Sequence, residues 1–137
     1  MKPKSKVLII AGSDSSGGAG IQADIKTVTA LGSYATTAVT AVTAQNTKGV
    51  KKITSIPTRI VQKQIIMILD DIGAHAVKIG MLHNADIIKS VCKILKKYKS
   101  KNVVLDPVMI AKGGEKLISN SSIKHLKKLL LPLCTLV

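Results

Sequence analysis

The chain has 137 residues, 46% of them hydrophobic and 1% aromatic, and its formal net charge is +14. This length and composition predict one domain whose core is built from Ile, Leu, Val and Ala. All basic residues except Arg59 are lysines, so guanidinium contacts to bases and aromatic stacking platforms are nearly absent, which disfavours specific nucleic-acid binding and favours solvated lysine faces.

Short β-branched runs alternate with longer segments of helical period, which predicts βαβ units around a mostly parallel sheet. The expected strands cover residues 7–11, 34–42, 77–81, 103–105 and 134–137. Helices are expected over residues 21–31, from a Thr58 cap to Gly73, from Asn84 to Tyr98, and from Ser121 or Ser122 to Leu131, where Pro132 stops the last one. Residues 48–57 are expected to form a turn and an irregular or edge strand.

A glycine-rich loop, AGSDSSGGAG, follows the first expected strand. It lacks the lysine of GxxxxGK[ST] and the spacing of G-x-G-x-x-G, so neither of the familiar phosphate-binding loops is present. It is instead predicted to be a tight turn at the carboxyl edge of a sheet, where open α/β folds bind ligands. An ordinary turn between a strand and a helix explains the loop equally well on its own.

Polar residues also follow the other expected strands, in TAVTAQNT, AVKIGML and VVLDPVMIAKGG. Gln45 can offer an amide donor and acceptor to the edge of a heterocycle, Asp24 can accept from an amino or hydroxyl group, and Met81 can line an apolar wall. Asp106 ends a buried strand with a carboxylate that suits Mg²⁺, or a water bound to it, near phosphates. A turn for Gln45, a first-turn helix carboxylate for Asp24 and a core position for Met81 remain as alternatives.

Targeting and redox signals indicate a soluble cytoplasmic protein. Cys92 and Cys134 are isolated and fit a reducing compartment better than a disulfide framework. The apolar run at residues 7–11 is too short for a signal peptide, and no stretch approaches the ~20 apolar residues of a membrane span. The three histidines show no metal-ligand spacing and are expected to be structural or on the surface.

Taken together and in this order, AGSDSSGGAGIQAD, TAVTAQNT, AVKIGML, VVLDPVMIAKGG and LLPLCTLV resemble the hydroxymethylpyrimidine/phosphomethylpyrimidine kinases of thiamine biosynthesis. The resemblance covers essentially the whole chain. It implies a ribokinase-like α/β fold of three layers with a mostly parallel central sheet. It also implies phosphorylation of hydroxymethylpyrimidine, and then of its monophosphate, with ATP and Mg²⁺.

The resemblance further implies which residues bind the pyrimidine: Gln45, Asp24, Met81, Val108 and Gly12. Asp106 matches the aspartate near the metal and the phosphates. The glycine-rich loop is then expected to form a wall of the pyrimidine pocket rather than a cradle for a nucleotide.

Chains of this family continue past LLPLCTLV with ATP-binding strands and a glycine-rich anion-hole segment that carries the catalytic cysteine. Residues 1–137 are therefore expected to be the truncated amino-terminal part of a single kinase domain, without a catalytic residue and inactive alone. Neither Cys92 nor Cys134 begins a glycine-rich helix, so neither replaces that cysteine. The alternative is a non-catalytic pyrimidine-binding remnant or interaction protein. A homodimer and a complementing carboxyl-terminal fragment remain open as partners.

Overall fold

The computed structural model describes residues 2–110, 114 and 116–137, and its centre is a five-stranded sheet of order β3-β2-β1-β4-β5. The strands are β1 (Lys6–Ser13), β2 (Tyr34–Asn46), β3 (Gly49–Ser55), β4 (Ala76–Ile79) and β5 (Val103–Leu105). β1 is parallel to β2 and β4, and β4 is parallel to β5, whereas β3 is antiparallel to β2. The predicted α/β fold with a mostly parallel sheet is confirmed, and residues 48–57 supply its edge strand.

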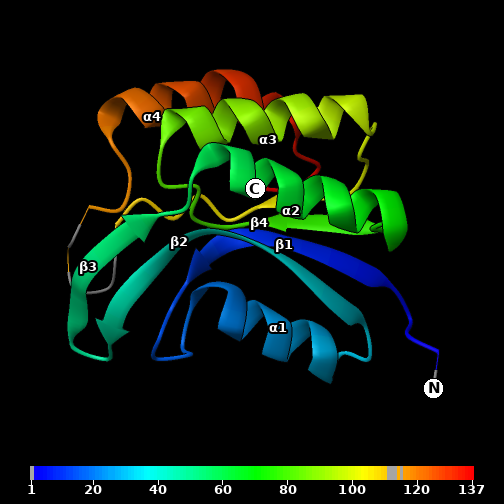
Figure 1. Ribbon diagram of the computed structural model, residues 1–137, viewed down its shortest axis with the longest axis horizontal. Helices are drawn as coiled ribbons and strands as arrows, with labels where there is room; N and C mark the ends of the chain where they lie inside the picture. Colours follow the sequence, from blue (N-terminus) through cyan, green and yellow to red (C-terminus); the bar gives the residue numbers. More distant parts are fainter. Residues whose placement is uncertain (1, 111–113, 115) are drawn as a thin grey trace.

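Helices cover both faces of the sheet and make three layers (Figure 1). α1 (Gly20–Ala30) lies on one face, while α2 (Thr58–Asp71), α3 (Ala85–Lys97) and α4 (Asn120–His125) lie on the other. α4 continues as a π-helical turn, Leu126–Leu130, and a 3₁₀ turn, Leu131–Leu133. Of the helices that the structure describes, none combines the length and hydropathy that crossing a bilayer requires.

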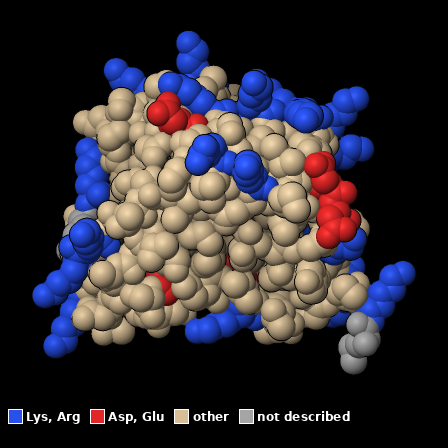
Figure 2. Space-filling view, viewed as in Figure 1, with Lys and Arg blue, Asp and Glu red and all other residues tan. Residues whose placement is uncertain are grey.

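The core is aliphatic, as the composition predicts. β1 is buried on both faces: Leu8 and Ile10 pack in the large cluster with α2 and α3, and Ile9 and Ala11 pack with Ile21 of α1. In α3 the apolar residues are buried and the lysines at positions 89, 93, 96 and 97 are exposed. Figure 2 shows most of the Lys and Arg side chains around the rim of one face of the molecule, with a few charged side chains within a mainly uncharged face.

The expected strand at residues 134–137 is wrong in extent. The backbone is extended from Cys134, where the strand was expected to begin, but among the described residues Leu136 forms a single parallel bridge with Val104 instead of a ladder. Pro132 lies within the 3₁₀ turn Leu131–Leu133 and does not directly follow the last helical residue. The Thr135 N–H still donates to the Val103 carbonyl at 2.7 Å, so the segment lies beside β5 without forming a full strand.

Most helix ends lie close to the predicted residues. Asn84 caps α3, its side chain accepting from the N–H of Ile87. Thr58, in contrast, is the first residue of α2 and makes no side-chain capping bond, because Pro57 occupies the cap position. α4 begins at Asn120, just before the predicted start, because Ser119 caps it.

Candidate functional site

A cleft of about 390 Å³ lies where the parallel strands reach their carboxyl ends. The β1–α1 loop, the first turns of α1, the end of β2 and the segments after β4 and β5 form its walls. All six residues that the sequence indicated line this one cleft: Gly12, Asp24, Gln45, Met81, Asp106 and Val108. The structure thus brings together residues that are far apart along the chain.

The Asp14 carboxylate shapes the glycine-rich loop. It accepts from the backbone N–H groups of Ser16 at 2.8 Å, Gly18 at 3.1 Å and Ala19 at 2.8 Å, and from the Ser16 hydroxyl. Burial alone raises the pKa of Asp14, but the hydrogen bonds from Ser16, Ala19 and Gly18 outweigh burial, and the pKa lies below its ordinary value of 3.8. The sequence analysis did not single out Asp14, although an Asp followed by small residues before a helix is a recognisable signal.

Two glycines let this loop pack closely against the sheet. Gly20 has φ of +57°, and a Cβ there would overlap the carbonyl oxygen of Gly12. A Cβ on Gly12 would in turn overlap the terminal methyl group of Met81. The apolar wall at Met81 is therefore in direct contact with the end of β1, where the loop begins.

Lys78 is a second charged residue of the cleft, after Asp14, that the sequence did not indicate. Its ammonium lies 2.7 Å from Asp24 Oδ2 and 3.9 Å from Asp106 Oδ2, and therefore links α1 to the end of β5 across the cleft. The sequence feature that could have pointed to Lys78 is a lone lysine within the otherwise apolar stretch AVKIGML. Asp24 lies beyond the first turn of α1, so its alternative interpretation as a first-turn carboxylate is wrong.

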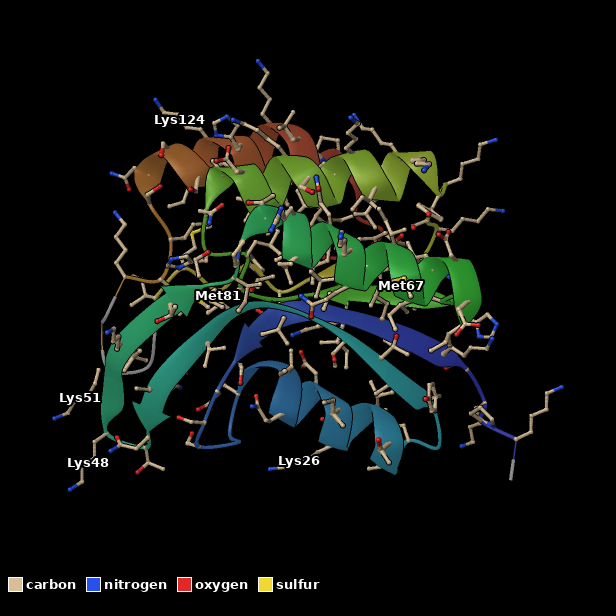
Figure 3. The ribbon with its side chains drawn as sticks, viewed as in Figure 1. Lys26, Lys48, Lys51, Met67, Met81 and Lys124 are labelled. Carbon is tan, nitrogen blue, oxygen red and sulfur yellow. The ribbon has the colours of Figure 1, made fainter. Side chains whose placement is uncertain are left out.

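Gln45 and Met81 form the other side of the cleft. The Gln45 backbone is fixed to the glycine-rich loop, since its N–H donates to the Ser15 hydroxyl at 2.9 Å and its carbonyl accepts from that hydroxyl. The side-chain oxygen of Gln45 accepts from the Thr43 hydroxyl at 3.2 Å. Met81, which is 9% exposed, packs in a small cluster with Leu117, so it is both a core residue and a wall of the cleft (Figure 3).

The carboxylates of the cleft fit a magnesium site with one protein ligand, and not a cluster of several protein ligands. Among the described residues, no group of three or more His, Cys, Asp or Glu side chains could hold a metal ion. The Asp106 side chain is 60% exposed and faces the cleft as a single carboxylate. Mg²⁺ commonly binds one or two carboxylates and takes its other ligands from water and phosphates, so Asp106 fits that role.

Neither cysteine is activated as a nucleophile. Burial raises the pKa of Cys92 to about 11 and raises that of Cys134 as well, so both thiols are protonated near neutral pH. Neither cysteine lines the cleft.

The three-layer fold with a ligand cleft at the carboxyl edge of its sheet is that of the ribokinase-like small-molecule kinases. The crystal structure of phosphomethylpyrimidine kinase from Clostridium difficile 630 superposes with a TM-score of 0.89 at 50% identity, covering 96% of this chain and 57% of that one. The ADP complex of Bacillus subtilis pyridoxal kinase superposes with a TM-score of 0.84 at 42% identity, covering 96% of this chain and 50% of that one.

Sequence comparison identifies the particular family. The family described as phosphomethylpyrimidine kinase matches residues 14–137. The hydroxymethylpyrimidine/phosphomethylpyrimidine kinase of Bacillus subtilis (strain 168) is 50% identical over 127 residues, which are 93% of this chain and 47% of that protein. The chain belongs to the phosphomethylpyrimidine kinase family, as the resemblance predicted, and spans about half the length of this relative.

Proposed function

We propose that the cleft binds hydroxymethylpyrimidine, and that residues 1–137 supply the pyrimidine-binding part of a kinase that phosphorylates this compound and its monophosphate with ATP. The observation that carries the proposal is the convergence of all six predicted site residues on one cleft. The names of the relatives support the kinase over the alternative of a non-catalytic interaction protein.

The residues of the cleft match a flat, polar-edged ring. Met81 and Val108 offer apolar surface to its faces, and the Gln45 amide offers both a donor and an acceptor to its edge. Lys78 binds Oδ2 of Asp24, and Oδ1 of Asp24 has no hydrogen bond to the described residues, so it can accept from a ring amino group. The salt bridge holds that carboxylate in place before the ligand arrives.

Asp106 would contribute one ligand to Mg²⁺, which would supply charge neutralisation for the phosphates. The ADP complex of Bacillus subtilis pyridoxal kinase, which superposes on this chain, supports a nucleotide as the phosphoryl donor. Because the relatives are about twice as long, we assign the nucleotide site to the part of their chains that residues 1–137 do not match. The free thiols of Cys92 and Cys134 support a cytoplasmic location.

A chimera tests this function. In it, residues 1–137 replace the matching half of the Bacillus subtilis kinase. We expect ATP-dependent phosphorylation of hydroxymethylpyrimidine by the chimera and none above background by residues 1–137 alone, because loss of one oxyanion-type donor already costs about 10²–10³ in turnover. A folded chimera that makes no product would contradict the proposal, and so would equal turnover by residues 1–137 alone.

A further inference from the structure

Very few of the described residues that line the cleft are charged. Among them Lys78 is the one cation, the carboxylates are those of Asp14, Asp24 and Asp106, and Lys78 forms ion pairs with the last two. Asp14 is 4% exposed and is saturated by the hydrogen bonds of its own loop. From the described residues, a ligand therefore meets two carboxylates and one ammonium, an excess of negative charge.

The Lys78 ammonium lies between those two carboxylates. It is 2.7 Å from Asp24 and 3.9 Å from Asp106, and the Lys78 side chain is 25% exposed, so water and ligands reach it. A Cβ on Gly80 would lie 3.3 Å from the Lys78 nitrogen, so the glycine keeps this position open. An ammonium has three N–H groups, and the hydrogen bond to Asp24 uses one of them.

The two proposed substrates make different demands on this site. Hydroxymethylpyrimidine is neutral, but its monophosphate brings a phosphate that the two carboxylates repel. We propose that Lys78 is the substrate-binding residue that admits the phosphorylated pyrimidine, because it offsets one carboxylate and donates its remaining N–H groups to a phosphate oxygen. This inference rests on the proposed function of the same cleft.

Calorimetric titration separates the two substrates. Lys78→Met, Lys78→Arg and wild-type protein would each be titrated with hydroxymethylpyrimidine and, separately, with its monophosphate, in the absence of ATP. Lys78→Met should weaken binding of the monophosphate about 10- to 100-fold more than binding of hydroxymethylpyrimidine, the range of a charge-assisted hydrogen bond, because both ligands lose the positioning of Asp24 but only the monophosphate loses a donor to its phosphate. Lys78→Arg should retain most of the monophosphate affinity.

Lys93→Met is the matched control, because Lys93 is exposed on α3 and its loss changes the net charge equally outside the cleft. Equal loss of both ligands in Lys78→Met would overturn the inference, since Lys78 would then act only by positioning Asp24. Unchanged affinity for the monophosphate would overturn it as well.

Wild-type protein provides a second test that needs no variant. Its affinity for the monophosphate should at least equal its affinity for hydroxymethylpyrimidine, because Lys78 offsets one carboxylate and donates to the phosphate. A monophosphate affinity at least about tenfold lower would contradict the role of Lys78 even if Lys78→Met does not fold. Wild-type protein that binds neither compound would overturn the proposed function, whereas binding of both without selective loss overturns this inference alone.

Discussion

Asp14 connects the shape of the glycine-rich loop to the pH dependence of stability. Its pKa is lower in the folded protein than in the unfolded chain, so the folded state favours the ionised form. The stabilisation is therefore fully present above the ordinary pKa of 3.8 and is lost as the pH falls through the lower folded value.

Asp14→Ala should lower the free energy of unfolding by about 1–2 kcal/mol at pH 7, since several loop N–H groups lose their acceptor. The difference from wild type should begin to shrink below about pH 4, where Asp14 of the unfolded chain takes up a proton, and should be lost as the pH falls through the lower folded pKa. Urea denaturation at several pH values measures both effects. Asp71→Ala removes an exposed carboxylate at the end of α2 and should change stability little. A loss that is the same at every pH would contradict the account.

Some residues of the cleft can be assigned to it from the sequence alone, and others cannot. Gln45 and Asp106 each stand where an expected strand ends, so their places at one sheet edge follow from the alternation of strands and helices. Lys78 could not be assigned in the same way, because its partner Asp24 is 54 residues away and only the packing of α1 against the sheet brings the two together.

At the scale of elements, the start of α1 depends on backbone contact. Gly20, the first residue of the helix, combines a positive φ with a position directly against the carbonyl oxygen of Gly12. A backbone atom cannot move aside as a flexible side chain can. Gly73, after α2, has a similar φ of +73° but has nothing within 4 Å of a Cβ built on it.

This pair of glycines permits a controlled prediction. Gly73→Ala should destabilise the protein by about 1 kcal/mol, the cost of the left-handed conformation alone. Gly20→Ala should cost about 1–3 kcal/mol more, because the new Cβ also forces the loop away from α1. Thermal or urea unfolding of the two variants measures the difference. Equal destabilisation would show that the contact with Gly12 does not constrain the loop.

The element boundaries that differ from expectation have tertiary causes. β2 extends to Asn46, beyond the predicted end at residue 42, because β3 pairs with its second half as a hairpin. At the other end of the chain, helical backbone continues past the expected stop at Leu131 as the 3₁₀ turn Leu131–Leu133, which accepts Pro132 in its first turn. The hydrophobic period therefore predicts which helices and strands exist better than it predicts their ends, because the ends depend on pairing with other parts of the chain.

At the scale of the whole molecule, the lysines lie on all three layers. Lys26 is on α1, Lys48 and Lys51 are on the β2–β3 hairpin, and Lys124 is on α4, at separate sides of the molecule (Figure 3). Such a distribution attracts a polyanion without fixing its orientation.

We therefore expect only weak binding of duplex DNA, without sequence preference, that disappears at physiological salt. Fluorescence anisotropy with two unrelated duplexes at about 20 and 150 mM salt measures this, since lower salt screens the charges less. Tight binding at the higher salt, or a preference for one duplex, would show that the lysines form a specific nucleic-acid surface.

The central claim is that the cleft at the carboxyl edge of the sheet binds hydroxymethylpyrimidine through Gln45. Calorimetric titration of hydroxymethylpyrimidine into wild-type protein, Gln45→Ala and Gln62→Ala tests it most directly, because Gln62 lies on α2 and does not line the cleft. We predict binding by wild type and Gln62→Ala, and a loss of about 1–3 kcal/mol in Gln45→Ala, the cost of leaving polar groups unpaired. No binding by folded wild-type protein, or the same affinity in Gln45→Ala, would contradict the claim.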